Sequence, residues 1–573
     1  MGVIEAIFGI ALMSLVFWSL FGVFRLSIEI VLNSKAKIGA LALANERIEF
    51  IRSLSYNDVG TLGGIPSGNI LQNEPVKLNQ TNYNRRTFIQ YMDDPQDGLG
   101  AADENGITAD YKIAKVELSW NLRGREYSFS LVTNVVPRGM ESVAGGGTIS
   151  VAVLDAFGVA LPGASVRIVN ATTNPVIDVT TFSNANGTVM LPGAPEASEY
   201  QVLVTKSGYS TAQTYGSIAE NPNPNPAHLS VLEAQTTNAT FSIDEVSTLS
   251  VYTYEPIKTE TFTDPFADGA LLSASASTTI SAGEVKLTSI AGLFESEGSI
   301  TSISIEPEYL YTWNEVSWED TVPPSTALRF TILYESTPGV FIVLPDSALP
   351  GNAAGFSTSP VDISSVSTTT YPALGLRADF STADPLLTPA LSSWMLSYEV
   401  GPVPLPDVDF ALQGAKTIGS DASAQPIYKY DDTHTTGASG AVTLPNLEWD
   451  TYLLSVDDVT GFDVAESCPF QPFGLAPGSA LTNVLYLVPN TTNSILVQAV
   501  DTTGIPLSGA SIRLYRAAYD ETIVASSCGQ SFFGALTAAN NYTVEVSKSG
   551  FQTATVSNVA VNDVATLTVV LTP

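Results

Sequence analysis

The 573-residue sequence has little positive charge, few cysteines and few histidines. It contains 24 Lys and Arg against 57 Asp and Glu, with two cysteines and two histidines. Proteins that bind nucleic acid need basic residues to neutralise phosphates, so nucleic acid is not an expected partner. His228 and His434 stand far apart and no CxxC pair occurs, which argues against zinc chemistry.

The amino-terminal stretch lacks both charge and proline. Glu5 is followed by 19 uncharged residues, from Ala6 to Phe24, and no proline occurs before Pro66. As a helix with a rise of ~1.5 Å per residue, this run would measure roughly 28 Å, which is about the thickness of a bilayer core. It is therefore long enough to span a membrane.

From Arg25 onward, apolar residues recur near helical spacing while charged residues occupy other faces. We predict one long helix over residues 1–54, apolar at its start and amphipathic at its end. A plain membrane anchor would explain the apolar run but not Glu5, because a carboxylate at the edge of an apolar span is costly. A signal peptide would need a basic start and a small-residue cleavage site, and the sequence has neither.

This stretch resembles the amino terminus of type IV pilins and pseudopilins, whose apolar helix carries a glutamate at the fifth mature position. The resemblance implies that Met1 is the processed, methylated first residue and that Glu5 pairs with the terminal amine of a neighbouring subunit. It also implies a helix that lies in the inner membrane before assembly and in the filament core afterwards. The family's basic leader and its frequent mid-helix proline are missing, with Gly22 near the place of the proline.

The rest of the chain has the composition of an extracellular β-protein. Residues beyond 54 carry 19 Lys and Arg against 53 Asp and Glu, which suits a solvated surface. The two cysteines are Cys468 and Cys528. In an exported region a disulfide between them is favoured over a metal site or a nucleophile, with free thiols as the alternative.

Residues 55–140 predict a small antiparallel sheet, and the pilin resemblance implies that it packs on the helix. Strand-like runs occupy residues 86–92, 111–121 and 127–136. The last two alternate apolar and polar residues and are joined by a hairpin signal at residues 122–125.

An acid-rich segment follows the first of these runs. Its carboxylates are Asp93, Asp94, Asp97, Asp103 and Glu104. Calcium prefers several oxygen ligands from a flexible turn, so this segment is a candidate calcium site. The spacing does not fit the EF-hand pattern, and an ordinary turn is the alternative. The sequence suggests no other cofactor.

Beyond a glycine-rich linker the chain repeats itself. DAFGVALPGASVRI at residues 155–168 aligns without gaps with DTTGIPLSGASIRL at residues 501–514, and a divergent copy begins at residue 404. The copies show strand alternation without a helical period. We therefore predict β-sandwiches over residues 141–247, 401–490 and 491–573. The repeat resembles carboxypeptidase-regulatory-like (prealbumin-like) domains, which implies a fold and an architectural role but no catalysis.

Residues 248–400 are patterned differently, with alternating aromatic residues, and predict one larger sandwich. They loosely resemble jelly-roll sandwiches of the discoidin or carbohydrate-binding kind. Such folds sometimes bind sugars by stacking, so Trp313, Trp318 and Trp394 are candidate ligand residues. A sandwich of this size also needs large core side chains, and a core role is the alternative.

The sequence contains no GxSxG, HExxH, P-loop or dinucleotide-binding motif. Carboxylate pairs of the kind used by glycosidases are plentiful in so acidic a chain, but repeated β-sandwiches give no reason to expect one. We expect that the protein is not an enzyme.

We therefore predict an α+β pilin module followed by several all-β sandwich domains. The expected function is that of a structural subunit of a type IV pilus-like filament on the cell surface. One rival is a minor, tip-located pilin acting as an adhesin toward a host surface or glycan. A second rival is a membrane-anchored surface receptor that never polymerises.

Overall fold

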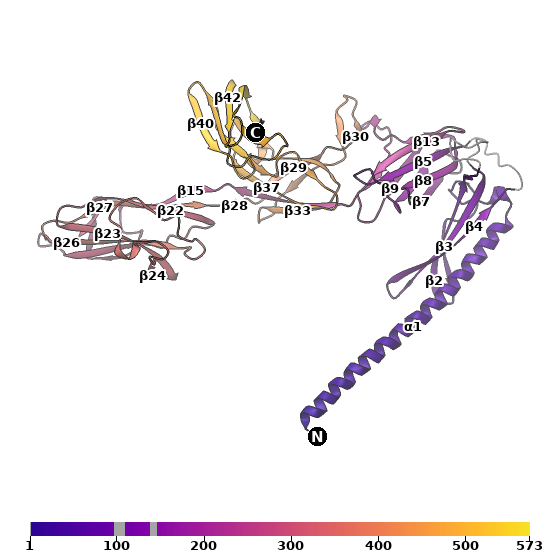
Figure 1. Cartoon of the computed structure of the whole chain (residues 1–573), viewed down its shortest axis with the longest axis horizontal. Coiled ribbons are helices and arrows are strands. Elements are labelled where there is room, and N and C mark those ends of the chain that lie inside the picture. Colours follow the sequence, from indigo (N-terminus) through magenta and orange to yellow (C-terminus); the bar gives the residue numbers. More distant parts are fainter. Residues whose placement is uncertain (1, 97–108, 138–145) are drawn as a thin grey trace.

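The computed structural model describes residues 2–96, 109–137 and 146–573. Helix α1 runs without a break from Val3 to Ser53, as the lack of proline predicts. Its 51 residues, at ~1.5 Å each, make a rod of roughly 75 Å. Figure 1 shows that the amino-terminal half extends alone, whereas the other half lies along a β-sheet.

This sheet, called the head, is antiparallel with its four strands in chain order. The strands are β1 (Asn73–Leu78), β2 (Thr81–Met92), β3 (Tyr111–Leu122) and β4 (Arg125–Val135). The last three overlap the three predicted runs. The sequence does not predict β1, whose Pro75 argues against a strand; an edge strand tolerates proline because one of its sides needs no donor.

Three similar sandwiches follow, called unit 1, unit 2 and unit 3. Unit 1 spans residues 146–244 and consists of β5 (Gly146–Leu154), β6 (Ser165–Asn170), β7 (Ile177–Phe182), β8 (Thr188–Pro195), β9 (Ala197–Thr205), β10 (Ala212–Gln213), β12 (Leu229–Val231) and β13 (Thr236–Ser242). Unit 3 spans residues 494–571 and consists of β38 (Ser494–Asp501), β39 (Ser511–Arg516), β40 (Tyr519–Val524), β41 (Gln530–Phe533), β42 (Ala539–Ser547), β43 (Ala554–Val561) and β44 (Val564–Leu571).

Units 1 and 3 share one topology. One sheet has the order β13-β5-β8 in unit 1 and β44-β38-β41 in unit 3, with the first strand parallel to the last. The second sheet has the order β10-β9-β6-β7 in unit 1 and β43-β42-β39-β40 in unit 3. In both units, alternate residues of the two sheets fill one hydrophobic core.

Unit 2 is interrupted by the larger sandwich, called the insert. Its first strand, β14 (Ser247–Glu255), pairs in parallel with β37 (Ala480–Pro489) and antiparallel with β33 (Ala441–Leu447). The sequence predicts residues 248–255 as part of the larger sandwich, and this pairing corrects that boundary. Alternation shows that a segment is a strand but not which sheet it joins. Unit 2 therefore comprises residues 247–255 and 403–489.

The insert joins unit 2 through a two-stranded ribbon. In this ribbon β14 pairs with β28 (Val403–Pro404), and β15 (Lys258–Asp264) pairs with β27 (Ala390–Val400). The other long strands of the insert are β21 (Glu297–Ser302), β22 (Leu310–Thr321), β23 (Thr326–Thr337) and β26 (Leu374–Thr382). The insert lies at the opposite end of the molecule from the helix (Figure 1). The expected class, one amino-terminal helix followed by many strands in sandwiches, is confirmed.

Candidate assembly surface

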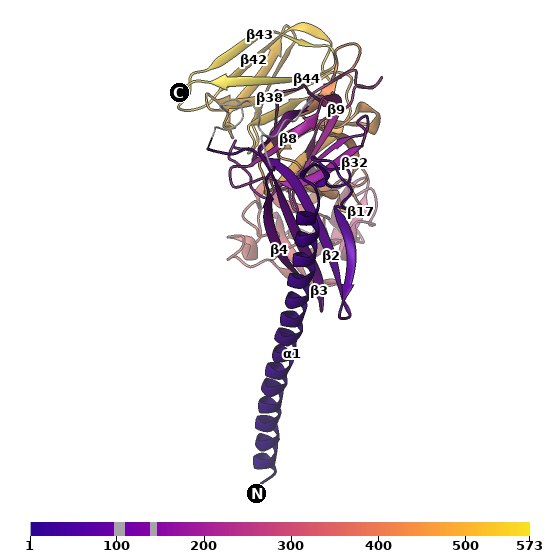
Figure 2. The same ribbon diagram turned by 90° about the vertical axis from the view of Figure 1, so that its right-hand side faces the viewer.

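The amino-terminal part of α1, residues 3–32, is called the bare half. Its large side chains that stand well exposed are Met13, Val16, Phe17, Trp18, Leu20, Phe21, Val23, Phe24, Leu26, Ile28, Ile30, Val31 and Leu32. These positions cover all sides of a helix, and in Figure 2 no strand lies beside this part of α1. By length and composition the helix can cross a membrane. So large an apolar surface calls for lipid or for other apolar segments as its neighbours.

Residues 33–53 of α1 are called the covered half, because the head buries one of their faces. The buried apolar residues of this face are Ala36, Ala40, Leu43, Ala44, Ile48 and Ile51. Apart from the adjacent pair Leu43 and Ala44, they recur every three or four residues, as expected for a helix with a single apolar stripe. Opposite them, Ala114, Val116 and Leu118 of β3 are fully buried.

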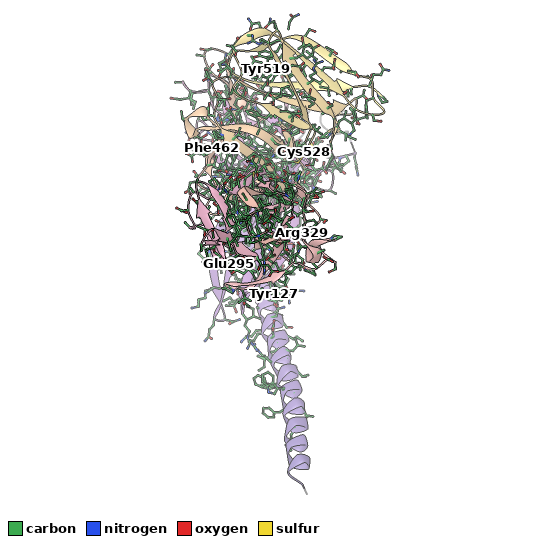
Figure 3. All side chains as sticks on the ribbon, turned by 90° about the vertical axis from the view of Figure 1, so that its left-hand side faces the viewer. Tyr127, Glu295, Arg329, Phe462, Tyr519 and Cys528 are labelled. Carbon is green, nitrogen blue, oxygen red and sulfur yellow. A yellow bond between two sulfur atoms is a disulfide. The ribbon has the colours of Figure 1, made fainter. Side chains whose placement is uncertain are left out.

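Two tyrosines of the head mark where the helix leaves it. The Tyr83 hydroxyl is buried and donates a hydrogen bond to the carbonyl of Ala36, at 2.8 Å. The Tyr127 hydroxyl donates to Oε1 of Glu29 at 3.3 Å, and Figure 3 labels Tyr127 near this exit point. The change from the covered to the bare half therefore falls between Ala36 and Glu29.

A charged cluster ties the covered half to the edge of the head. Arg47 of α1 forms an ion pair with Glu74 of β1, and Nε of Arg85 donates to the same Glu74 oxygen at 3.0 Å. Burial acts to raise the pKa of Glu74, but the hydrogen bonds and charges of Arg85 and Arg47 outweigh it, so the pKa lies below its usual value. The sequence does not predict this cluster, since nothing local connects three residues so far apart in the chain.

The two residues expected to direct assembly are Met1 and Glu5. Met1 lies outside the described residues. Glu5 lies on α1 within the bare half, and its side chain is not among those described. The pairing of Glu5 with a neighbour's amine stays a prediction.

The candidate calcium site is described only in part. Asp97, Asp103 and Glu104 lie outside the described residues. Asp93 and Asp94 follow β2 directly, and the backbone N–H of Asp94 donates to Oδ2 of Asp110 at 2.6 Å. Within residues 2–96, 109–137 and 146–573, no three His, Cys, Asp or Glu side chains form a group that could hold a metal ion. Calcium binding stays a prediction.

The suggestion that three tryptophans of the insert stack on a sugar is wrong. Trp313, Trp318 and Trp394 are all buried and belong to the hydrophobic core of the insert. Trp318 stacks on Phe330 with a ring-centroid distance of 3.8 Å, and Nε1 of Trp313 donates to the carbonyl of Tyr371. A ring enclosed in this way offers no face to a sugar, and the alternation of aromatics reflects the inward side of the strands.

Cys468 and Cys528 form a disulfide, the pairing that the sequence analysis favoured. The bond joins β35 (Phe462–Cys468) of unit 2 to unit 3; Figure 3 labels Cys528. Beside it, Nε2 of Gln530 donates to the carbonyl of Ser467 at 2.7 Å, and the N–H of Ser467 donates back to Oε1 of Gln530 at 2.9 Å. These contacts fix unit 3 on unit 2.

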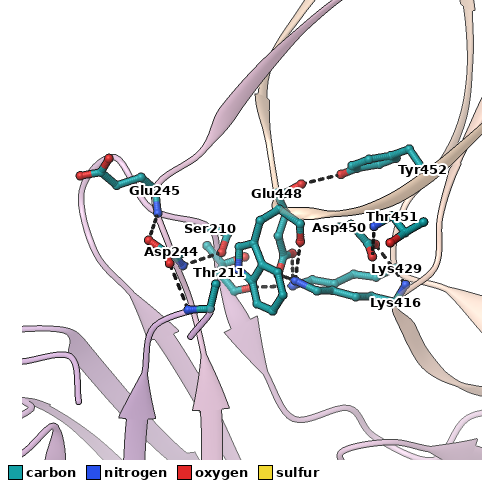
Figure 4. A network of polar contacts seen from close by, with 12 residues as sticks. Ser210, Thr211, Asp244, Glu245, Lys416, Lys429, Glu448, Asp450, Thr451 and Tyr452 are labelled. Atoms are coloured by element: carbon teal, nitrogen blue, oxygen red, sulfur yellow. Dashed lines mark hydrogen bonds and ion pairs between the residues drawn. The ribbon is translucent and has the colours of Figure 1, made fainter. Parts of the chain in front are cut away.

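A polar joint connects unit 1 and unit 2 (Figure 4). The carboxylate of Glu448 accepts hydrogen bonds from Nζ of Lys416 and Nζ of Lys429, and Lys429 also donates to the carbonyl of Thr211 in unit 1. Burial, its largest cause, lowers the pKa of Lys416 although Glu448 acts to raise it. Strand β11 (Asn223–Pro224) extends this joint by pairing with β30 (Thr417–Ser420). The sequence does not predict this joint either.

Comparison with known proteins supports one part of this architecture. Residues 148–244, which make up unit 1, match the carboxypeptidase regulatory-like domain. The predicted resemblance is confirmed for this unit. No curated protein shows a significant sequence match to the chain.

Similar solved structures include the Bacillus anthracis TIE protein, which has 10% identity and a TM-score of 0.15 over 87% of this chain and 73% of that chain. The major pilin subunit BcpA of Bacillus cereus has 10% identity and a TM-score of 0.13, over 74% of this chain and 99% of its own. The full-length major pilin SpaD from Corynebacterium diphtheriae has 11% identity and a TM-score of 0.13, over 75% and 98%. TM-scores so far below 0.5 show no common arrangement of whole chains.

Proposed function

We propose that the protein is a structural subunit of a type IV pilus-like filament at the cell surface. In this proposal the bare half of α1 polymerises, and the head, the three units and the insert are displayed outside. The role is structural and includes no catalysis. The observation that carries the proposal is the division of one continuous helix into a half covered by the head and a half that exposes large apolar side chains on all sides.

The bare half cannot remain in water. Full burial of an exposed large apolar side chain is worth about 1.5–3 kcal/mol, so covering these thirteen partly exposed side chains is worth on the order of 10–25 kcal/mol. Lipid can supply this cover before assembly. Lipid and neighbouring helices are equally apolar, however, so the apolar side chains do not by themselves favour a filament over a membrane.

Glu5 supplies the preference for assembly. A carboxylate near the end of an apolar span is costly in lipid and needs an opposite charge. No Lys or Arg precedes Arg25, so the partner expected from the pilin resemblance is the terminal amine of a neighbouring subunit. The pair would set the axial register of the filament rather than supply much energy, because desolvation offsets its attraction.

The proposal is tested by replacing Glu5. We expect Glu5→Ala to leave the protein in the membrane fraction and to reduce sheared filaments at least tenfold. The matched control is Glu49→Ala in the covered half, whose exposed carboxylate pairs only with Arg52 among the described salt bridges. Normal filaments with Glu5→Ala would contradict the proposal.

The nested insert favours a second candidate, a minor or tip-located subunit. A sandwich of this size projecting sideways from unit 2 would be easier to place at a tip than on every subunit of a shaft (Figure 1). Quantitative mass spectrometry of sheared filaments separates the candidates. A major subunit would dominate the sample and a minor one would be present in few copies. A receptor that never polymerises would be absent, which would contradict both forms of the proposal.

A further inference from the structure

Strand β44 forms one edge of unit 3. It pairs in parallel with β38 along its whole length, from Ser494 opposite Val564 to Asp501 opposite Leu571. Within residues 146–573, all of which are described, no strand pairs with its other side. One row of backbone donors and acceptors of β44 therefore faces outward.

This edge lacks the features that normally prevent edge strands from pairing with other chains. Such strands are usually protected by charge, proline or a bulge. The sequence of β44 is VATLTVVL, without charge, proline or glycine, and its register with β38 is regular. Its outward side chains, Val564, Thr566, Thr568 and Val570, are all exposed.

The other two edge strands near it are protected. Strand β40 carries Asp520 and Glu521, whose charges oppose pairing with a second copy. Strand β43 has two register shifts, and Asn558 within it has a φ of 59°. The remaining edge strand, β41, lies against unit 2, where Gln530 exchanges hydrogen bonds with Ser467. Among the four edge strands of unit 3, only β44 therefore combines a regular register with an uncovered, uncharged and β-branched surface.

In unit 2 the equivalent edge strand is β37, and another strand of the same chain covers its outer side. Strand β37 pairs in parallel with β14 on one side, just as β44 pairs with β38. On its other side β37 pairs antiparallel with β35, from Phe462 opposite Pro489 to Cys468 opposite Val484. The chain therefore already covers one such edge with an antiparallel apolar strand.

We propose that the open edge of β44 pairs antiparallel with β44 of a second copy of this chain. A strand that pairs with itself in this direction creates a closed two-fold contact. When the two-fold axis passes through Leu567, the outward side chains of both copies lie on one face of the joined sheet and the inward side chains on the other. Val564 of one copy then lies opposite Val570 of the other, and Thr566 lies opposite Thr568. Val–Val and Thr–Thr pairs are favourable neighbours across strands.

A second copy is favoured as the occupant because β44 is complementary to itself in this register. Each chain carries a net charge of −33, which opposes close contact between copies over most of their surface, whereas β44 itself carries no charge. Unit 3 lies far from the amino-terminal end of α1 (Figure 2). The contact would therefore link neighbouring chains at a distance from their helices, for example two filaments side by side. It does not depend on the proposed filament.

Cross-linking of the full chain in detergent tests this register. Thr566→Cys and Thr568→Cys proteins, each carrying a different tag, are oxidised mildly either alone or as an equimolar mixture. In the mixture the two cysteines are directly opposed, about 4.5–5.5 Å apart between Cα atoms and within disulfide reach. In either variant alone the two cysteines are diagonal neighbours, about 7–8 Å apart. We expect at least tenfold more disulfide-linked dimer in the mixture than in either variant alone.

Two further variants keep the test specific. Thr522→Cys, on the charged edge strand β40, replaces Thr568→Cys as the matched control and should give no dimer above background. Val570→Lys, at an exposed position, should reduce the dimer of the original mixture to background without changing the melting temperature. Equal yields from the mixture and the single variants, or a yield unaffected by Val570→Lys, would overturn the proposal.

Discussion

The two halves of α1 belong to one unbroken helix, but their apolar residues are arranged differently. In the covered half they form a single stripe that includes the small residues Ala36, Ala40 and Ala44, and the head of the same chain buries it. In the bare half large apolar residues lie on every side, and no described part of the chain covers them. A narrow stripe can be covered by one sheet, whereas a fully apolar surface needs neighbours all around it. The covered half therefore stabilises the fold, and the bare half is available for a membrane or an assembly.

The largest expected difference comes from placing a charge in each half. Ala44 is fully buried between α1 and the sheet, so Ala44→Asp would leave an unpaired carboxylate in an apolar interface. We expect it to lower the free energy of opening of the β3 amides by more than ~4 kcal/mol. Ile30→Asp in the bare half should change that free energy by less than ~0.5 kcal/mol. Hydrogen exchange of the full chain in detergent measures both, and similar effects would remove the distinction between the halves.

A somewhat smaller effect is expected from the charged cluster that holds the covered half. Glu74→Gln would leave Arg47 and Arg85, whose side chains are 12% and 8% exposed, without their shared carboxylate. Breaking a buried ion pair from one side costs about 3–5 kcal/mol, and we expect a loss near 3 kcal/mol in the same hydrogen-exchange measurement. Glu49→Gln, at an exposed ion pair of α1, is the control and should cost at most ~0.5 kcal/mol.

The same variant predicts a dependence on pH. The folded pKa of Glu74 lies below its unfolded value, so its stabilising effect is complete above the unfolded pKa of about 4.3 and is lost as the pH falls through the folded pKa. The difference between the natural protein and Glu74→Gln should therefore shrink below about pH 4. A difference that grows on acidification would show that the carboxylate is not held in its charged form.

Much of this fold could be predicted because its signals are local. The lack of proline and the run of uncharged residues predict α1 to within two residues of its observed ends, and the repeated GAS segments predict units 1 and 3. The nesting of the insert could not be predicted, since alternation in β14 is the same whichever sheet it joins. It is shown by the pairing of β14 with β33 and with β37, the latter more than 200 residues away in the chain.

The site was predicted less completely. The apolar character of the bare half follows from the sequence, but its separation from the covered half depends on Tyr83 and Tyr127, which approach the helix only in three dimensions. The cluster of Arg47, Glu74 and Arg85 was missed for the same reason. The aromatics of the insert were assigned in part to a ligand, because a sequence shows the alternation of side chains but not which side of the strand is enclosed.

The smallest effect is expected from adding one methyl group to a glycine in each half. Glycine to alanine favours an exposed helix by about 1 kcal/mol. At Gly22 a Cβ would meet no described atom within 4 Å, so Gly22→Ala should strengthen the bare half and leave the opening of the head unchanged. At Gly39 a Cβ would lie 2.6 Å from the Tyr83 hydroxyl, which is held by its hydrogen bond to Ala36. Gly39→Ala must displace that hydroxyl, and leaving it unpaired costs about 1–3 kcal/mol, which offsets or exceeds the helical gain.

Hydrogen exchange of the β2 and β3 amides would therefore show a head that Gly39→Ala destabilises by about 1 kcal/mol. Tyr83→Phe removes the hydroxyl, so the double variant Gly39→Ala, Tyr83→Phe should be less destabilised than the sum of its two single changes. Strict additivity would mean that the methyl group and the hydroxyl do not meet. Equal effects of Gly39→Ala and Gly22→Ala would mean that the head does not hold the covered half as closely as the Tyr83 contact requires.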